Sequence, residues 1–365
     1  MNFDFSDEQR SLQQELRTYL TAASPLVRSR KVLEGATGID SELWTEMAGL
    51  GWLGIAIPER FGGSGLGVLE LALAAEEVGR ALSPIPFGSS VCAVAEAIVR
   101  HGTEAQQERW LPGLANGAEI GVLALAERPG PFSPVELTTK MAGGRLDGSK
   151  IAVADGGVAT FAIVACQQSV TGCLALVALD QPNVEREASR SIDPSRSVST
   201  LVFRDAVAES FGDEASLDAL MLSAATLQAF EQIGGADVVF ALTREYMDLR
   251  QAFDRPISSY QALKHRMADL YATLEVARSN AYYAAWALSA GSQELADAAC
   301  CARIAASQAF QLATVEAIQL HGGIGFTWES DCHLFYRRAK WLAASLGAPD
   351  EWRERLVSEL DAELR

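Results

Sequence analysis

The chain has 365 residues, of which 49% are hydrophobic and 21% are charged, a balance typical of a folded protein with a sizeable core. Its formal net charge of −17 disfavours binding to nucleic acid or to an anionic membrane surface, because both would repel it. No apolar run reaches the roughly 18 residues that span a bilayer, and the acidic N-terminus is not typical of a secretory signal. We therefore expect a cytoplasmic protein.

The cysteines and histidines argue against a metal site. The six cysteines contain no CxxC pair and no spacing typical of metal ligands. In a cytoplasmic protein such residues are ordinarily buried or free thiols. The four histidines are scattered along the chain, which disfavours a zinc or iron site.

The first predicted segment, residues 1–120, is helical. Ser6 has the position of a helix cap before an acidic first turn, and apolar residues then recur at helical spacing. The glycine-rich stretch GGSGLG at residues 62–67 lacks the preceding strand and the βαβ spacing of a dinucleotide-binding loop. We therefore predict an N-terminal α-helical domain.

The remaining chain has two further patterns. In residues 121–212, short β-rich segments are separated by Gly, Asp and Pro, which predicts a compact antiparallel barrel or sandwich. In residues 213–365, long apolar stripes on three or four consecutive helices predict a four-helix bundle. The predicted fold class is α+β, mainly α. The extra apolar surface of such a bundle also predicts an oligomer.

One candidate site lies in the stretch RQAFDRPISSYQALKH. Arg250 is predicted to end a long helix beside a rigid turn that contains Phe253, and Gln261 is predicted to begin the next helix. A cation fixed at a helix end suits either a salt bridge or a phosphate clamp. The residue types alone leave both alternatives open.

A second candidate site lies in AIQLHGGIGF. Gln319 is predicted at a helix end, three residues before the pair Gly322 and Gly323. Two glycines without side chains fit either a tight turn between helices or a backbone that approaches another molecule closely.

Taken together, these motifs resemble the acyl-CoA dehydrogenase family over essentially the whole chain. The resemblance rests on the helical, β and helical order, on R-x-A-F-x-x-P-I-x-x-x-Q-x-x-K-H, and on Q-L-H-G-G-I-G-F further along. The LGIAIPERFGGSGLG loop and the YRRAK segment agree with it. The resemblance implies a flavoprotein oxidoreductase that uses FAD to remove two hydrogens from Cα and Cβ of an acyl-CoA thioester. A carboxylate takes the Cα proton, and electrons leave to an electron-transfer flavoprotein.

The resemblance also implies which residues contact FAD. In the family, the matching arginine and the Gln-x-x-Gly-Gly loop contact the pyrophosphate and adenosine half of an FAD that a neighbouring subunit holds. By position these residues are Arg250, Phe253, Gln261, Gln319, Gly322 and Gly323. A guanidinium can neutralise diphosphate charge, and glycines let the backbone approach it.

The stretches that match the flavin-ring contacts of the family depart from its pattern. In LALAERPGPFSP, Ala126 stands where the family has a threonine, and Arg128 stands where it has a proline. In KIAVADG, Ala152 replaces a tryptophan and Ala154 replaces a threonine. Alanine offers neither an aromatic face nor a hydroxyl group, so this half of a flavin site is expected to be missing.

The catalytic base is also missing from its usual places. The two positions at which the family carries its glutamate read Leu346 and Ala224 here, and neither side chain can accept a proton. Glu231, His333 and Glu329 remain as candidates for an atypical base.

The chain therefore resembles the small, base-lacking subunit of bacterial heteromeric acyl-CoA dehydrogenases. The leading hypothesis is one subunit of an FAD-dependent α2β2 enzyme of steroid side-chain or fatty acid β-oxidation, which completes the FAD site of a second, similar subunit. A self-sufficient homo-oligomeric acyl-CoA dehydrogenase with an atypical base is one alternative. A non-catalytic scaffold on the same fold is the other.

Overall fold

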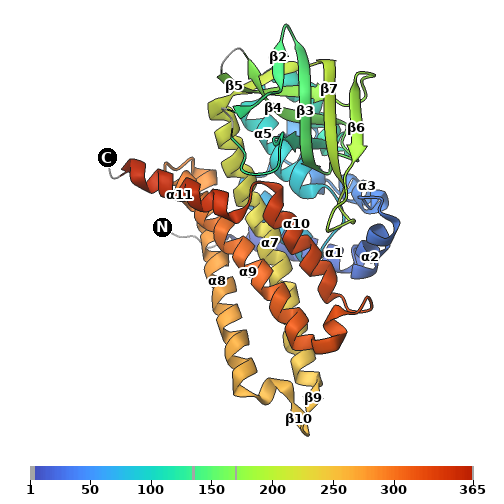
Figure 1. Ribbon diagram of the computed structural model, residues 1–365, viewed down its shortest axis with the longest axis vertical. Helices are drawn as coiled ribbons and strands as arrows, with labels where there is room; N and C mark the ends of the chain where they lie inside the picture. Colours follow the sequence, from blue (N-terminus) through green and yellow to red (C-terminus); the bar gives the residue numbers. More distant parts are fainter. Residues whose placement is uncertain (1–4, 134–135, 169–170, 364–365) are drawn as a thin grey trace.

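The computed structural model describes residues 5–133, 136–168 and 171–363, so residues 1–4 and 364–365 of the predicted terminal domains lie outside it. Along the chain, helices are followed by a sheet and then by long helices (Figure 1). This order confirms the α+β, mainly α, fold class.

The N-terminal part is helical, as predicted. Its elements are α1 (Asp7–Ala23), α2 (Leu26–Gly35), α3 (Ser41–Gly49), η1 (Trp52–Gly54), η2 (Glu59–Phe61), α4 (Val68–Arg80), the π-helical η3 (Phe87–Ala95), α5 (Glu96–His101) and α6 (Glu104–Ala115). The Ser6 hydroxyl accepts a hydrogen bond from Gln9 N at 3.2 Å, and Gln9 Oε1 accepts one from Ser6 N at 2.9 Å. This reciprocal capping satisfies two backbone donors and fixes the start of α1 where the sequence predicts it.

The middle of the chain forms a mixed sheet. Its strands are β1 (Gly121–Ala124), β2 (Lys140–Ala142), β3 (Arg145–Ala154), β4 (Phe161–Gln168), β5 (Thr171–Ala178), β6 (Val184–Ala188), β7 (Val198–Val207) and β8 (Glu209–Asp213). They are ordered β6-β7-β3-β2-β4-β5-β8, with β1 beside β4. The prediction of purely antiparallel pairing is wrong, because β4 runs parallel to β1 and to β2. The long segment between β1 and β4 gives the chain room to return in the same direction.

The C-terminal part is a helical bundle. Its elements are α7 (Glu214–Leu249), β9 (Gln251–Ala252), β10 (Arg255–Pro256), η5 (Ile257–Ser259), α8 (Gln261–Ala290), α9 (Leu295–His321), η6 (Gly322–Phe326), α10 (Cys332–Ser345) and α11 (Pro349–Glu363). Helix α7 begins beside the sheet and runs to the β9–β10 hairpin at the opposite end of the molecule (Figure 1). One helix therefore connects the sheet to the far end of the bundle.

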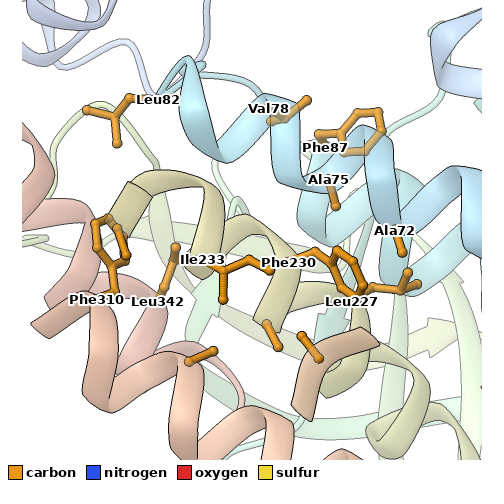
Figure 2. Packing of buried hydrophobic residues seen from close by; sticks show 14 of the residues in the cluster. Ala72, Ala75, Val78, Leu82, Phe87, Leu227, Phe230, Ile233, Phe310 and Leu342 are labelled. Atoms are coloured by element: carbon orange, nitrogen blue, oxygen red, sulfur yellow. The ribbon is translucent and has the colours of Figure 1, made fainter. Parts of the chain in front are cut away.

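The N-terminal helices and the bundle share a single core. Figure 2 shows the segment of α4 that carries Ala75 and Val78 packed over the segment of α7 that carries Phe230 and Ile233. These side chains belong to one buried cluster that also includes Phe310 of α9. Burial of a large apolar side chain contributes about 1.5–3 kcal/mol, so this shared core holds the two helical parts together.

Two glycines allow α4 and α7 to approach closely. A Cβ atom on Gly79 would lie 2.0 Å from the Glu231 carbonyl oxygen, and one on Gly234 would lie 2.0 Å from the Glu76 carbonyl oxygen. No real side chain tolerates such contacts, so each helix needs a glycine where the other crosses it. The crossing in turn fixes the position of Glu231 and its neighbours on α7.

We predict that Gly79→Ala lowers the free energy of unfolding by about 1–3 kcal/mol, because the added methyl group forces the two backbones apart. Gly49→Ala in α3 is the matched control, since a Cβ atom there meets nothing within 4 Å. The control should leave stability unchanged or raise it slightly, because alanine favours a helix. Urea unfolding of both variants measures the difference. Equal losses in the two variants would contradict the close crossing.

Candidate functional site

A cleft of about 220 Å³ lies between the sheet and the bundle. One wall includes Ala126, Ala152 and Ala154, which are the positions that match the flavin-ring contacts of the family that the sequence resembles. The opposite wall includes Ala224 and Leu346, the positions that match its glutamate base. The structure brings all five positions to one cleft, and none of them offers a hydroxyl, an aromatic ring or a carboxylate.

The sheet-side wall is shaped by a bulge in β3. The register of β3 against β7 shifts after Lys150. Ala152 in the bulge has a φ of 53°, a left-handed conformation that costs a residue with a Cβ atom roughly 1–2 kcal/mol. Lys150 Nζ donates hydrogen bonds to the Leu125 carbonyl at 2.9 Å and to Glu127 Oε1 at 2.8 Å. These bonds tie the bulge to the segment that carries Ala126, so the wall keeps its shape although its side chains are small.

The Glu127 carboxylate holds this wall as an anion. Burial raises its pKa, but hydrogen bonds from Lys150, Thr138 and Thr139 lower it further, to about 2. The stabilisation it provides is therefore complete above its ordinary pKa and is lost only as the pH falls toward 2. Burial lowers the pKa of the Lys150 ammonium, and its hydrogen bond to the Glu127 anion opposes that shift.

A buried charge cluster forms the inner end of the cleft. Arg196 Nε donates to Asp155 Oδ1 at 2.9 Å, and Arg338 Nε donates to Asp193 Oδ2 at 2.7 Å. Glu231 Oε1 lies 3.5 Å from a terminal nitrogen of each of these two arginines. Glu231 does line the cleft, but its carboxylate is directed at two guanidinium groups. This geometry argues against Glu231 as a proton acceptor and favours a structural role.

Two polar atoms in the cleft have no hydrogen-bond partner among the described residues, although one of them has the 3.5 Å ion-pair contact to Glu231 described above. They are Arg196 Nη1 and Gln228 Oε1, which are both buried. Ser345 Oγ donates to the Leu342 carbonyl, so it must accept the hydrogen bond from Gln228 Nε2 at 2.6 Å, and this fixes Oε1 as the free end of the amide. Neither side chain was predicted from the sequence as a residue of the site. Gln228 could have been found, because it lies one helical turn after Ala224 on the same face.

His333 and Glu329 lie elsewhere. His333 lines a second cavity, of about 470 Å³, together with Gln319. Its Nδ1 accepts from Arg337 Nε at 3.4 Å and its Nε2 lies 3.2 Å from the Trp328 carbonyl, while burial lowers its pKa. Glu329 is exposed, and neither residue is among those that line the cleft. The hypothesis that either residue could approach the cleft as a base gains no support from this placement.

The hairpin at the far end of the bundle carries the first group of predicted FAD contacts. Arg250 follows α7 directly, Gln261 begins α8 as predicted, and both side chains are exposed. Phe253 and Asp254 form the two-residue turn between β9 and β10, with φ values of 53° and 58°. Positive φ at both turn residues is typical of a type I′ hairpin, in which Gly or Asn is preferred. Phe253 is nevertheless 92% exposed, so an unfavourable backbone conformation presents an aromatic ring to the outside.

The second group of predicted FAD contacts lies at the same end of the bundle. Gln319 is exposed in the last turn of α9, which ends at His321. Gly322 has a φ of 63°, and a Cβ atom on Gly322 or Gly323 would meet nothing within 4 Å. The Tyr246 ring of α7 stacks on His321 with ring centres 4.1 Å apart, which brings this loop next to the end of α7. The two groups therefore form one exposed surface, called the tip below and defined by Arg250, Phe253, Gln261, Gln319, Gly322 and Gly323.

Across residues 5–133, 136–168 and 171–363, no helix is both long enough and apolar enough to cross a membrane. Over the same described residues, no three His, Cys, Asp or Glu side chains are grouped so that they could hold a metal ion.

The chain thus places a sheet between helical layers, with a cleft between the sheet and the bundle. Residues 6–118 match the family described as Acyl-CoA dehydrogenase, N-terminal domain, and residues 215–358 match Acyl-CoA dehydrogenase, C-terminal domain. The chain belongs to the acyl-CoA dehydrogenase family.

Individual relatives cover the whole chain. It is 32% identical to the acyl-CoA dehydrogenase IpdE2 of Mycobacterium tuberculosis over 355 residues, which are 97% of this chain and 98% of that protein. Among solved structures it is similar to a variant of the Tcur3481-Tcur3483 steroid ACAD, with a TM-score of 0.90, 30% identity and 98% of each chain covered. It is also similar to the ChsE4-ChsE5 complex from Mycobacterium tuberculosis, with a TM-score of 0.92, 27% identity and 99% of each chain covered.

We predict that Glu231→Gln lowers the free energy of unfolding by about 1–3 kcal/mol, because both arginines lose a buried anionic neighbour while each keeps its aspartate. Guanidinium unfolding of the purified chain measures the loss. Glu245→Gln, an exposed position on the same helix, is the control and should leave stability unchanged. If Glu231 were a catalytic base, its replacement would instead abolish turnover and leave stability intact.

Proposed function

We propose that this chain is one subunit of a heteromeric, FAD-dependent acyl-CoA dehydrogenase, and that its tip completes an FAD site held mainly by a second, similar subunit. The observation that carries the proposal is an asymmetry. The chain presents exposed groups suited to a diphosphate at its tip, whereas its own cleft has Leu346 and Ala224 at the two positions that match the family's base and alanines at those that match its flavin-ring contacts. Bound FAD supplies the acceptor for the hydride removed from Cβ of the acyl-CoA, and the electrons then pass to an electron-transfer flavoprotein.

The distance between cleft and tip supports a role toward another chain. Ala224 and Leu249 lie on one uninterrupted helix, α7. At 1.5 Å per residue they are about 37 Å apart along its axis. The tip therefore cannot reach a ring placed in the cleft of its own chain. Its exposed groups are suited to a ligand that a neighbouring subunit holds.

The chemistry of the tip fits the pyrophosphate and adenosine half of FAD. Among the described residues none hydrogen bonds to or pairs with the Arg250 guanidinium, so it is free to bind an anion. The backbone at Gly322 and Gly323 is open, which lets a phosphate or ribose approach it. The Phe253 ring offers an exposed aromatic face for stacking.

The chain's own cleft does not fit the flavin ring or the acyl-CoA. Its alanine wall offers no hydroxyl for the ring edge and no aromatic face. A neighbouring cavity of about 390 Å³, which shares Leu346 and Glu351 with the cleft, also carries the carboxylates of Glu214 and Asp218. Its one arginine, Arg355, is paired with Asp218 at 2.7 Å. Such an acidic surface repels the phosphates of coenzyme A.

The similar solved structures support a pair of unlike chains. Two of them carry paired names, ChsE4-ChsE5 and Tcur3481-Tcur3483, and the second is described as a steroid ACAD. By analogy we extend the proposal to an acyl-CoA with a bulky, ring-containing acyl group. This extension rests on likeness alone, because the substrate pocket lies in the partner.

We predict that Arg250→Gln weakens FAD binding to the co-expressed assembly by about tenfold to a hundredfold, because a charge-assisted contact to the diphosphate is lost. Arg244→Gln is the matched control, since it removes an exposed arginine from the same helix outside the tip. Titration of the apo-assembly with FAD, followed by flavin fluorescence, gives both dissociation constants.

An equal loss of FAD affinity in both variants would show that only the net charge matters, and it would contradict a specific contact between Arg250 and the diphosphate. Unchanged binding in Arg250→Gln would remove the tip from the FAD site. Size-exclusion chromatography of both variants distinguishes loss of the cofactor from loss of the assembly.

A further inference from the structure

Two cysteines face each other across neighbouring strands of the sheet. In the antiparallel pair β4–β5, Cys166 lies directly opposite Cys173, and their sulfur atoms are 3.3 Å apart. Directly paired residues in such a ladder have Cα atoms about 4.5–5.5 Å apart, which lies within the range that a disulfide spans. A bond between these sulfurs therefore needs side-chain rotation and no rearrangement of the backbone.

The contact makes the two thiols chemically unequal. The two sulfurs lie within hydrogen-bonding distance and either thiol can be the donor; when Cys166 donates, the contact raises the pKa of Cys166 and lowers the pKa of Cys173. The thiolate is the reactive form of cysteine, so Cys173 is the better nucleophile. Cys173 also retains 6% exposure, whereas Cys166 has none. The more reactive sulfur is thus also the more accessible one.

We propose that Cys166 and Cys173 form a site of reversible oxidative modification, at which hydrogen peroxide converts two thiols into a disulfide across β4 and β5. The Cys173 thiolate attacks one peroxide oxygen, so that an S–O bond forms, the O–O bond breaks and hydroxide leaves as water after taking a proton. Cys166 then loses its proton and its sulfur attacks the Cys173 sulfenic acid, forming the S–S bond while the S–O oxygen leaves as a second water. Two thiols and one peroxide thus give one disulfide and two waters.

The position of the pair allows peroxide to reach it. Only two residue pairs, Gln167 with Gly172 and Gln168 with Thr171, separate the cysteines from the end of the paired strands. Strand β2 pairs with β4 at Gln167 and strand β8 pairs with β5 at Cys173, so peroxide enters through a local opening at this end of the sheet, which needs less free energy than unfolding of the core. Peroxide is nearly as small as water, so a brief opening suffices.

The remaining cysteines offer no comparable geometry. Among the described residues, no other two cysteine sulfurs are in hydrogen-bonding contact. Cys300 and Cys301 are adjacent in α9, and neighbouring helix residues point about 100° apart. Oxidation is therefore expected to be selective for the β4–β5 pair.

The test counts thiols in one peptide. The fully reduced chain is treated with hydrogen peroxide, its remaining thiols are blocked with N-ethylmaleimide, and it is digested with trypsin. Residues 151–186 contain both cysteines and no internal Lys or Arg, so they leave as a single peptide. We expect this peptide to lose both blockable thiols and to regain them after dithiothreitol. The whole chain should fall from six free thiols to four. A peptide that keeps both thiols would overturn the proposal.

Three variants assign the roles. Cys166→Ala should stop at a Cys173 sulfenic acid that dimedone traps, and Cys173→Ala should leave Cys166 unoxidised. Cys301→Ala, a partly exposed position on α9, is the control and should still form the disulfide. A disulfide that disappears in the control, or persists in Cys166→Ala, would contradict the assignment. Because the peroxide is added and the readout is the peptide mass, the result does not depend on FAD or on a partner subunit.

Discussion

The sheet is held against the bundle by a cluster of five buried charges. Asp155, Asp193 and Arg196 come from loops of the β-rich part, Glu231 comes from α7 and Arg338 from α10. Taking charges out of water is unfavourable, and each is tolerated only while its partners are correctly placed. Because those partners lie on three different parts of the chain, the sheet can dock on the bundle in one orientation. The cleft is the space that this orientation leaves beside the cluster.

Helix α7, which carries Glu231, also connects the cleft to the second functional surface, the tip. Helix α7 begins near the cleft and ends at Leu249, directly before Arg250, so a single rigid element fixes how far the tip lies from the cleft. At the cleft, alanines and a leucine stand where flavin contacts and a base belong in a self-sufficient enzyme. At the tip, an exposed arginine, a phenylalanine in a left-handed conformation and two open glycines are retained. An unfavourable backbone conformation such as that of Phe253 is expected to persist where it serves a function. This expectation favours a tip that binds a ligand of another chain.

The sequence was sufficient to predict features that depend on local physics. Helical spacing, the Ser6 cap and the glycines after His321 each place an element through contacts within a few residues, and all three agree with the structure. Strand direction in the sheet was not predictable, because a short β-rich segment does not indicate which distant strand it pairs with. The parallel pairing of β4 with β1 and β2 was for this reason not predicted.

The polar groups of the cleft were harder to predict for the same reason. In the sequence, no neighbouring residue indicates a partner for the Glu231 carboxylate, because the two arginines that contact it, Arg196 and Arg338, are far away along the chain. Arg196 lies in the loop SIDPSRS, where no periodicity points to burial. His333 follows the glycine loop closely, yet its ring is committed to Arg337 and Trp328 in a different cavity. Such contacts can be recognised only when distant parts of the chain are seen together.

The most direct test of a shared FAD site is the number of flavins bound per chain. The chain would be purified alone and together with a co-expressed second acyl-CoA dehydrogenase-like subunit, and bound FAD would be counted by its absorbance after denaturation. A shared site predicts no flavin on the isolated chain and one flavin for each pair of unlike chains in the assembly. One flavin per chain on the isolated protein, with turnover of an acyl-CoA, would contradict the account and show that the alanine-lined cleft is a complete active site.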